Sequence, residues 1–169
     1  MKNCRVYENE NMREITGDTL RPGGFLLTEK AIEICQFKPH DKILDVGCGM
    51  GATVEKLKSQ YEFDAYGIDP SKKLLELGRK KYGNDNLIQG KGENLPFTEC
   101  FFKGVLAECT LSLMDDYEKT IMESKRVLKP NGYFYISDVY ARRPEYLEGV
   151  QKHNVESCMF RNVRLSLAL

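Results

Sequence analysis

A short apolar run that passes directly into three closely spaced glycines is the feature that most constrains the fold. Residues 42–46, Lys-Ile-Leu-Asp-Val, indicate a buried strand, and Gly47, Gly49 and Gly51 follow it. Glycine has no side chain, so the backbone can turn tightly there and approach a ligand closely. Together with Ala52, the first two glycines satisfy the pattern G-x-G-x-x-G/A of nucleotide-binding sheets. This segment therefore predicts a strand, a tight turn and a helix beside a nucleotide.

Strands and helices alternate along the rest of the chain. This order is typical of an α/β fold, in which helices cover both faces of a parallel sheet. Ligands of such sheets bind beyond the carboxyl ends of the strands, so functional residues are expected there. The remaining predicted strands cover residues 65–69, 87–89, 104–107 and 133–138.

Two predicted helices begin at capping residues. Thr28 and Ser71 each stand at the start of a segment with helical spacing of apolar residues, where their side chains can accept from a free backbone N–H, and Asp115 and Asp116 open a third such segment. The turn sequence Pro-Asn-Gly at 130–132 is expected to end the last of these helices. The first helix is expected to bury one apolar face, made of Leu27, Ala31, Ile34 and Cys35.

Length and composition favour one cytoplasmic domain. The 169 residues, 41% of them hydrophobic, predict a single domain over 1–169, with an N-terminal arm at 1–24 and a helical C-terminal segment at 141–169. Lys plus Arg and Asp plus Glu are balanced at 25 each, so no overall charge favours nucleic acid or a membrane surface. Neither an apolar stretch of ~20 residues nor an export signal is visible, which predicts a cytoplasmic location.

The cysteines give no sign of a metal site. They lie at positions 4, 35, 48, 100, 109 and 158, and no two have the C-x-x-C spacing of zinc and redox sites. No metal is therefore expected. Without an export signal, the thiols are expected to be reduced and to act as small apolar side chains.

Asp45 distinguishes between two classes of ligand. Its carboxylate stands two residues before the first glycine, beside the turn where a dinucleotide would place its pyrophosphate. Two anions would repel each other there, whereas a ligand with an ammonium or sulfonium cation would be attracted. The other interpretation is a carboxylate that caps its own turn.

Asp69 indicates a nucleoside. It ends the second predicted strand, directly before Pro70 and Ser71, where a carboxylate can accept hydrogen bonds from both hydroxyls of a ribose. NAD and adenosyl ligands share this ribose, so Asp69 does not choose between them. A simple helix cap is the alternative.

Four motifs together resemble the class I S-adenosylmethionine-dependent methyltransferases. They are the turn at 45–51, Asp69, Gly-Glu-Asn-Leu-Pro-Phe at 92–97 and Arg-Val-Leu-Lys-Pro-Asn-Gly-Tyr at 126–133. Each motif alone is moderately specific, but their order across residues 20–140 is characteristic. The resemblance implies a Rossmann-like sheet with strand order 3-2-1-4-5, S-adenosylmethionine as methyl donor and a small-molecule acceptor.

The resemblance also implies the cofactor contacts. The carboxylate of Asp45 would hold the methionine amino group, often through water, while Asp69 would bind the ribose hydroxyls and Pro70 would pack on the adenine. The residues before Leu-Pro-Phe would close over the adenine edge. The full predicted set is Asp45, Gly47, Cys48, Gly49, Asp69, Pro70, Gly92, Glu93 and Glu108.

Lys91 departs from the family pattern. Many members have Gly-Asp-Ala before Leu-Pro-Phe, and that aspartate accepts from the adenine amino group, whereas this chain has Gly-Lys-Gly at 90–92. Lysine has donors only, so Lys91 is expected to point to solvent. Glu93 or a backbone carbonyl would then have to accept from the adenine.

The loop at 108–112 is expected near the transferred methyl group. Glu108 is the candidate for a group beside the acceptor, although methyl transfer depends mainly on alignment and needs a general base only when the acceptor must lose a proton. Cys109 is similar in position to a metalloid-binding cysteine of arsenite methyltransferases, but no other cysteine can be placed beside it, and a buried thiol is the alternative. The turn Arg-Pro-Gly-Gly at 21–24 resembles the entry of some bacterial and archaeal members, where it would fold over the cofactor or lie at the surface.

Two other functions fit part of the sequence. A nicotinamide-dependent oxidoreductase would explain Gly47, Gly49 and Asp69, but not Asp45 or the later motifs. A truncated, non-catalytic binding module is the second, because only about 30 residues follow the fifth strand, where the family usually adds a helix and a strand hairpin. If that hairpin is missing, the exposed edge of the fifth strand invites pairing, and a homodimer is expected.

Overall fold

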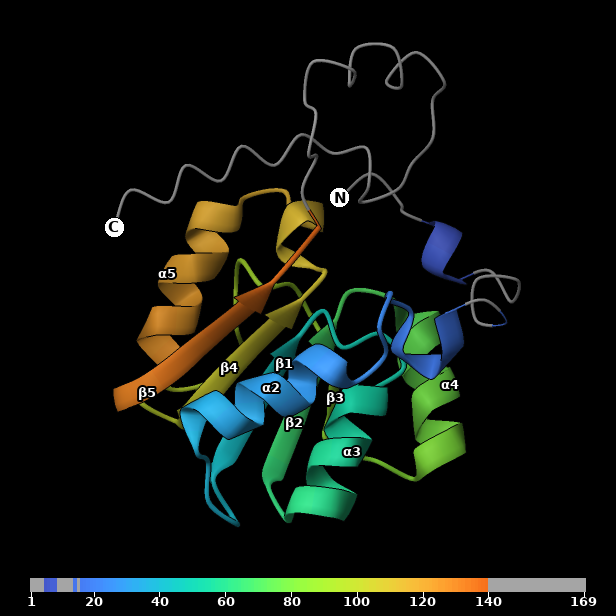
Figure 1. The fold of residues 1–169 in the computed structure, drawn as a ribbon. Coiled ribbons are helices and arrows are strands. Elements are labelled where there is room, and N and C mark those ends of the chain that lie inside the picture. Colours follow the sequence, from blue (N-terminus) through green and yellow to red (C-terminus); the bar gives the residue numbers. More distant parts are fainter. Residues whose placement is uncertain (1–4, 9–13, 15, 140–169) are drawn as a thin grey trace.

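The computed structural model describes residues 5–8, 14 and 16–139, which Figure 1 shows as a ribbon. The predicted helical segment at 141–169 lies outside the described residues, so it stays a prediction, as does part of the N-terminal arm. Within the described ranges, no helix combines the length and the apolar character that crossing a bilayer would require.

Five parallel strands form one sheet in the order β3-β2-β1-β4-β5, which confirms the predicted fold class and strand order. The first strand along the chain is central and pairs with β2 on one side and β4 on the other. Among the described residues, β5 is an edge strand of the sheet. The predicted absence of a strand hairpin after β5 concerns residues 140–169, which lie outside the described part of the chain. The strands are β1 (Lys42–Val46), β2 (Asp64–Asp69), β3 (Leu87–Gln89), β4 (Phe102–Glu108) and β5 (Leu128–Ser137).

Helices cover both faces of this sheet, and alternate residues of β1 pack against different helices. Ile43 belongs to a buried cluster with residues of α2, α3 and α4, whereas Leu44 and Val46 belong to a second cluster that includes Val127 of α5. Successive strand residues point to opposite faces, so Asp45 shares the face of Ile43. The helices are α2 (Leu26–Cys35), α3 (Ala52–Tyr61), α4 (Lys72–Tyr82) and α5 (Tyr117–Val127), with short 3-10 turns η1 (Arg5–Glu8), η2 (Gly17–Thr19) and η3 (Leu111–Leu113).

The predicted helix cap at Ser71 is confirmed, and the structure shows a second cap at Asp116, in the pair of aspartates predicted to open its helix. The Ser71 hydroxyl accepts a hydrogen bond from the backbone N–H of Leu74 at 3.2 Å, and the Asp116 carboxylate accepts from that of Lys119 at 2.9 Å. Both bonds satisfy donors that have no partner inside the helix. Ser71 therefore fixes the start of α4 at Lys72, two residues beyond Ser71's neighbour Pro70 and close to Asp69 at the end of β2.

The prediction for α2 was wrong at its start and for Leu27 and Ile34, whereas Ala31 and Cys35 are buried as predicted. The helix begins after Phe25, and Thr28 lies inside it, fully buried. Thr28, Ala31 and Cys35 form the buried face, while the side chains of Leu27 and Ile34 are 44% and 60% exposed. A polar contact accompanies this orientation: the Thr28 hydroxyl donates to a carboxylate at the end of β4, so the helix turns Thr28 rather than Ile34 toward the sheet.

The prediction that the turn sequence at 130–132 ends α5 was wrong. The helix ends at Val127, and β5 starts at the next residue, where Leu128 pairs with Phe102. The register then shifts before Tyr133 pairs with Gly104, so 130–132 form an irregularity within the strand, with Asn131 at a φ of 58°. Such an insertion interrupts the ladder locally, and regular pairing continues from Tyr133 to Ser137.

Candidate functional site

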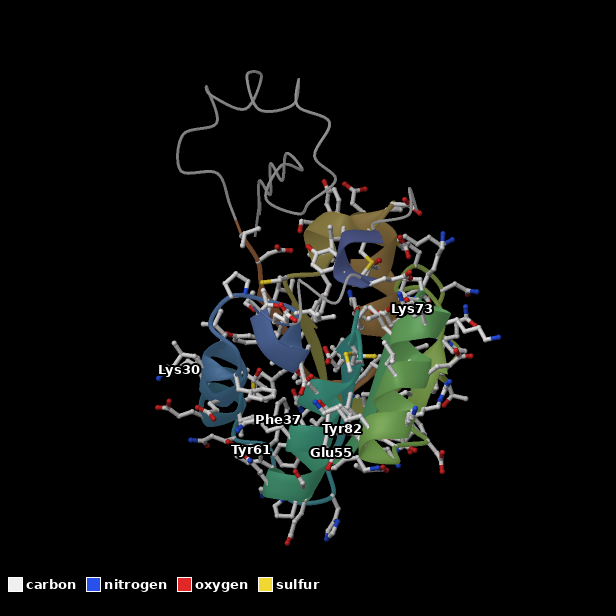
Figure 2. The ribbon with its side chains drawn as sticks, turned by 90° about the vertical axis from the view of Figure 1, so that its right-hand side faces the viewer. Lys30, Phe37, Glu55, Tyr61, Lys73 and Tyr82 are labelled. Atoms are coloured by element: carbon white, nitrogen blue, oxygen red, sulfur yellow. The ribbon has the colours of Figure 1, made fainter. Side chains whose placement is uncertain are left out.

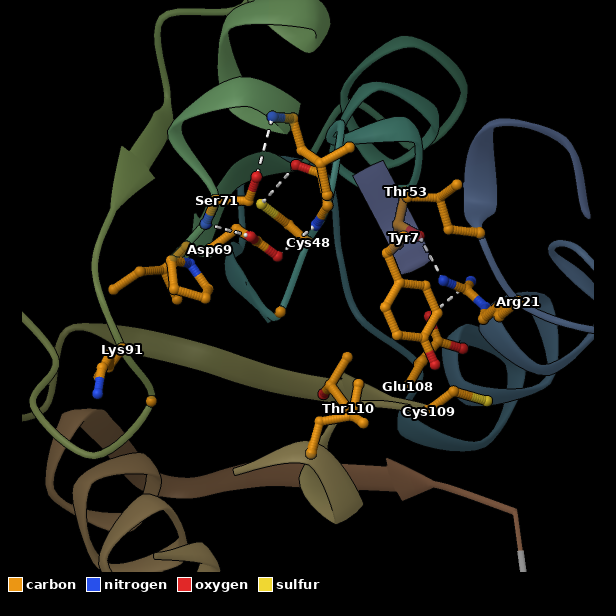
Figure 3. A pocket seen from close by; sticks show the side chains of 18 of the residues that line it. Tyr7, Arg21, Cys48, Thr53, Asp69, Ser71, Lys91, Glu108, Cys109 and Thr110 are labelled. Carbon is orange, nitrogen blue, oxygen red and sulfur yellow. Dashed lines mark hydrogen bonds and ion pairs between the residues drawn. The ribbon is translucent and has the colours of Figure 1, made fainter. Parts of the chain in front are cut away.

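A cavity of about 780 Å³ lies at the carboxyl ends of β1, β2 and β4. Its volume is within the range of roughly 300–1,000 Å³ that small-molecule sites occupy. Figure 3 shows Asp69, Ser71 and Lys91 toward one end and Arg21, Glu108 and Cys109 toward the other. The cavity therefore occupies the position at which doubly wound sheets bind ligands, as the sequence predicts.

The predicted glycine turn forms the floor between these two ends. Gly47 and Cys48 donate their backbone N–H groups to the carbonyl of Ile68, at 2.8 and 3.1 Å, and this anchors the turn to β2. Gly47 has a φ of +79°, and a Cβ there would lie 2.5 Å from Cγ2 of Thr110. The Thr110 hydroxyl in turn donates to the carbonyl of Val46 at 2.8 Å. Only glycine lets this turn and the loop after β4 lie so close together.

Asp69 ends β2 and lines the cavity. One carboxylate oxygen accepts from the backbone N–H of Gly49 at 2.9 Å, and the other accepts from that of Ser71 at 2.8 Å. Burial raises the pKa of this carboxyl, and the two backbone hydrogen bonds oppose the rise. Each oxygen keeps acceptor capacity for a ligand, because a carboxylate oxygen offers two lone pairs. Pro70, the next residue, also lines the cavity.

Asp45 lies behind the cavity wall and is only 3% exposed. Burial raises the pKa of its carboxyl to about 7, the charge of Glu108 adds to the rise, and the charge of Arg21 opposes it. Among the described residues, none donates a hydrogen bond to this carboxylate. Asp45, the predicted anchor for the ligand's amino group, is therefore a buried acid beside the cavity. Glu108 and Arg21, the two charged residues that act most strongly on it, both line the cavity.

Arg21 and Glu108 form a buried ion pair that the sequence did not predict. The Nη2 atom of Arg21 donates to Glu108 Oε2 at 2.9 Å and to Thr28 Oγ1 at 2.7 Å, and Nη1 donates to Thr53 Oγ1 at 3.2 Å. The Thr28 hydroxyl donates to Glu108 at 2.9 Å. Burial raises the Glu108 pKa, whereas Arg21 and Thr28 lower it. The turn at 21–24 thus brings its arginine into the site.

The N-terminal arm contributes further residues to the cavity wall. The Ser71 hydroxyl donates to the Glu8 carboxylate at 2.7 Å, and the Lys73 ammonium donates to the Glu8 carbonyl at 3.0 Å. Leu20 packs with Met50 and Leu74 in a small apolar cluster that Tyr7 also contacts. Figure 2 shows the side chains along α4, where Lys73 near the start and Tyr82 at the end both bond to the arm.

Two residues of the predicted adenine edge have other partners. Glu93 is not in the cavity wall, and one of its oxygens accepts from the backbone N–H groups of Asp115 and Asp116, at 2.9 and 3.4 Å. Lys91 lines the cavity, but its half-exposed side chain forms an ion pair with Asp115 at 3.2 Å. Gly92 also lines the cavity, where a Cβ would contact the Thr120 side chain at 2.8 Å. The other oxygen of Glu93, Oε2, is buried and meets no donor among the described residues, so its role as an acceptor for the adenine stays a prediction.

Two cysteines line the cavity. Cys48 is buried within the glycine turn, and Cys109 is half-buried with a φ of 56° at the opposite end. Cys35 and Cys100 do not line it, so the described residues do not gather a set of thiols around Cys109. No group of three His, Cys, Asp or Glu suited to a metal ion occurs in residues 5–8, 14 and 16–139.

Known proteins are similar to this chain in sequence and in fold. Residues 44–136 match the family described as methyltransferase domain. The uncharacterized methyltransferase YodH of Bacillus subtilis is 30% identical over 127 residues, which cover 73% of this chain and 54% of that protein. A demethylmenaquinone methyltransferase of Chlorobaculum tepidum is 32% identical over 108 residues, or 64% of this chain and 45% of the relative. The crystal structure of Bacillus subtilis YcgJ has a TM-score of 0.64 at 27% identity, with 75% and 56% of the two chains covered.

These matches cover the sheet and most of the cavity. The chain spans about half the length of the curated relatives it matches. The family match includes the glycine turn, Asp69 and the loop after β4, but it begins after Arg21 and Thr28. None of the comparisons supports the predicted homodimer. The ion pair between the arm and β4 therefore lies partly outside the family match.

Proposed function

This chain belongs to the methyltransferase-domain family of class I S-adenosylmethionine-dependent methyltransferases, and we propose that it transfers a methyl group to a small-molecule acceptor in the cavity described above. The position of Asp69 carries the proposal. Two backbone N–H groups fix its carboxylate at the end of β2, with its remaining acceptor capacity available to the cavity. A ribose with two hydroxyls is the ligand that this arrangement fits best.

The residues around the cavity fit S-adenosylmethionine at both ends. Asp69 and Pro70 would hold the ribose and adenine, with Gly47, Cys48, Gly49 and Gly92 forming the surface between the turn and the base. At the other end, Asp45 and Glu108 are buried acids near Arg21, the one buried cation in the part of the chain that the structure describes. A ligand with a sulfonium and an ammonium group would be attracted to this excess of negative charge. Because Asp45 lies behind the wall, its contact with the ammonium would run through water.

When bound, S-adenosylmethionine supplies a methyl group on a positively charged sulfur; the methyl moves to the acceptor nucleophile, and the sulfur leaves as a neutral thioether. The residues of the chain position the two reactants, since alignment supplies much of the rate in such a displacement. The Thr110 hydroxyl fixes the loop after β4 against Val46. That loop would form the acceptor side of the cavity, with Cys109, Leu113 and Met114 in its wall.

Glu108, the predicted group beside the acceptor, is proposed to position other residues rather than to take a proton. Its side chain is fully buried, and both oxygens are engaged by Thr28 or Arg21. To act as a base, Glu108 would first have to break its ion pair with Arg21. The proposal therefore favours an acceptor whose nucleophile is already deprotonated when it binds.

Calorimetry can test the ligand class. Saturable binding of S-adenosylhomocysteine and no binding of NADH are expected, since the buried acids disfavour a pyrophosphate. The variant Asp69→Ala should weaken S-adenosylhomocysteine binding at least tenfold, because hydrogen bonds to a charged group contribute roughly 1.5–3 kcal/mol each. Asp85→Ala, which removes an exposed carboxylate from the turn before β3, is the matched control. Binding of NADH alone would refute the proposal.

Methyl transfer itself is tested with a panel of acceptors. Labelled S-adenosylmethionine should give labelled product with at least one small thiol, amine or hydroxyl compound. If the ligand binds and no acceptor is methylated, the alternative of a non-catalytic binding module is favoured instead. The cytoplasmic location stays a prediction from the sequence.

A further inference from the structure

Resting on the proposed function, we infer that Asp138 is a positioning residue, which holds the acceptor side of the cavity in place through hydrogen bonds to Ser112. The acceptor wall is the part of the loop after β4 that lines the cavity, namely Cys109, Thr110, Leu113 and Met114. Asp138 does not line the cavity itself, so it acts on the acceptor through this loop. The family match ends at residue 136 and does not include it.

The carboxylate of Asp138 binds the middle of this loop at two points. Its Oδ2 accepts from the backbone N–H of Ser112 at 2.9 Å, and its Oδ1 accepts from the Ser112 hydroxyl at 3.0 Å. The Oδ1 atom also accepts from the backbone N–H of Val139 at 2.8 Å, which orients the carboxylate at the end of its own strand. Hydrogen bonds to an ionised oxygen are the stronger kind. One half-buried side chain thus joins the end of β5 to the loop after β4.

Ser112 is the middle residue of η3, the short turn that shapes the acceptor wall. Leu111, on one side of it, is 2% exposed, whereas Leu113, on the other side, lines the cavity. The structure shows no side-chain cap at the start of this turn. Hydrogen bonds within a 3-10 turn have poor geometry, so a turn of three residues depends on contacts from outside. Asp138 supplies two of them at the central residue.

The acceptor wall is held from two different strands. The Thr110 hydroxyl donates to the Val46 carbonyl at 2.8 Å, which ties the first part of the loop to β1 beside the glycine turn. On the other side, the Cys109 backbone N–H donates to the Ser137 carbonyl at 2.7 Å, and Asp138 extends this attachment to η3. Figure 3 shows Cys109 and Thr110 next to each other in the wall. Loss of the Asp138 carboxylate should therefore move the wall and leave the cofactor end in place.

The position of this wall matters because methyl transfer depends on alignment. A displacement of about 1 Å between the reacting atoms can slow such a reaction roughly a hundredfold. Leu113 and Met114 offer the acceptor apolar contacts, so the place where it rests follows from the backbone that carries these side chains. Asp138 is therefore expected to set kcat/KM for the acceptor, whereas Asp69 sets the affinity for the cofactor.

Steady-state kinetics separate these two effects. The assay uses the full chain and the compound of the acceptor panel that is methylated fastest. Asp138→Ala should lower kcat/KM for this compound about tenfold or more, while the Kd of S-adenosylhomocysteine stays within about twofold of its original value. Asp138→Asn should recover most of the loss, because its amide oxygen can still accept from the Ser112 backbone N–H. Asp85→Ala, at an exposed turn, is the control and should leave both values unchanged.

Alkylation by iodoacetamide reports the position of the wall without an acceptor. Cys109 is half-buried in the wall and Cys100 is exposed, so the ratio of their alkylation rates measures how far the wall has opened. Trypsin separates the two thiols at Lys103, and mass spectrometry of the peptides gives each rate. With saturating S-adenosylhomocysteine, D138A should raise the ratio severalfold. Ser112→Ala, which loses only the hydroxyl bond, should raise it less, and it keeps the test valid if D138A does not fold.

Failure of the inference and failure of the proposed function give different results. If the natural chain binds no S-adenosylhomocysteine or methylates no compound of the panel, the proposed function fails and the inference falls with it. If the natural chain does both, and D138A keeps kcat/KM or leaves the alkylation ratio unchanged, only the role of Asp138 is rejected. An equal loss of cofactor and acceptor binding in D138A, without recovery in D138N, would show a general structural role and also overturn the inference.

Discussion

Asp45→Asn should stabilise the ligand-free protein at neutral pH and weaken its ligand binding. The carboxyl is buried, and its pKa is raised to about 7, mainly by burial and then by the charge of Glu108. At pH 8 the folded protein must therefore hold an unfavourable charge. An asparagine of nearly the same shape removes that charge, so the variant should unfold at a higher temperature.

The magnitude follows from the two pKa values. A carboxyl with an ordinary pKa of 3.8 and a folded value of about 7 holds its proton more tightly in the folded protein than in the unfolded chain. Stability is therefore lost as the pH rises from about 4 to about 7, at roughly 1.4 kcal/mol per pH unit, or about 4 kcal/mol in all. The stability gained by D45N should grow across this window and then stay constant. For a domain of this size, the difference corresponds to a Tm shift of roughly 8–16 °C.

Thermal unfolding followed by circular dichroism at pH 5, 6, 7 and 8 measures this difference. The matched control is Asp85→Asn at the exposed turn before β3, which should show no such growth with pH. A stability difference that is the same at every pH, or a D45N protein that is less stable than the natural chain at pH 8, would refute the reasoning. Calorimetry on the same samples should show weaker S-adenosylhomocysteine binding by D45N, as expected when stability is given up for function.

Three further variants test other parts of the site. Gly47→Ala should lower both the Tm and ligand affinity, because its Cβ would clash with the loop after β4, whereas Gly83→Ala, with a similar positive φ and open space, should cost only about 1 kcal/mol in thermal unfolding. Ser71→Ala and Asp116→Ala should each lose about 1 kcal/mol of stability as cap deletions, but calorimetry should show weaker ligand binding only for S71A. Lys91→Asn should tighten S-adenosylhomocysteine binding severalfold in the same assay, because an amide oxygen can accept from the adenine amino group; unchanged affinity would place Lys91 away from the base.

Features encoded by neighbouring residues could be predicted from the sequence. The bounds of β1 and β3, the cap at Ser71 and the start of α5 beside Asp116 depend on apolar runs and on polar residues next to helix starts. The strand order depends on the motifs that resemble a known family. The position of Asp69 at the cavity follows from the local pattern and from the strand order together. Asp69 stands between the end of a strand and the start of a helix, and the strand order brings that strand end to the cavity.

Contacts between distant segments could not be predicted in this way. Arg21 and Glu108 are 87 positions apart, and Thr28 and Glu108 are 80 apart. The sequence pattern of α2 does not show that Thr28, a polar residue, lies on the buried face of the helix. The exposure of Ile34, which lies off that face, could therefore not be predicted. The early start of β5 has the same origin, since it depends on pairing with Phe102 across the sheet.

The charge arrangement explains why the N-terminal arm belongs to the site. Because β2 and β4 both run parallel to β1, Asp45 near the end of β1 and Asp69 and Glu108 at the ends of β2 and β4 bring three carboxylates to the carboxyl-terminal edge of the sheet. Each is buried, and burial raises the pKa of each, so the edge alone carries charge that it cannot stabilise. Arg21 is the one buried cation among the described residues, and it comes from the arm. It offsets part of this charge, and a cationic ligand offsets more, so the arm and the ligand stabilise the same edge of the sheet.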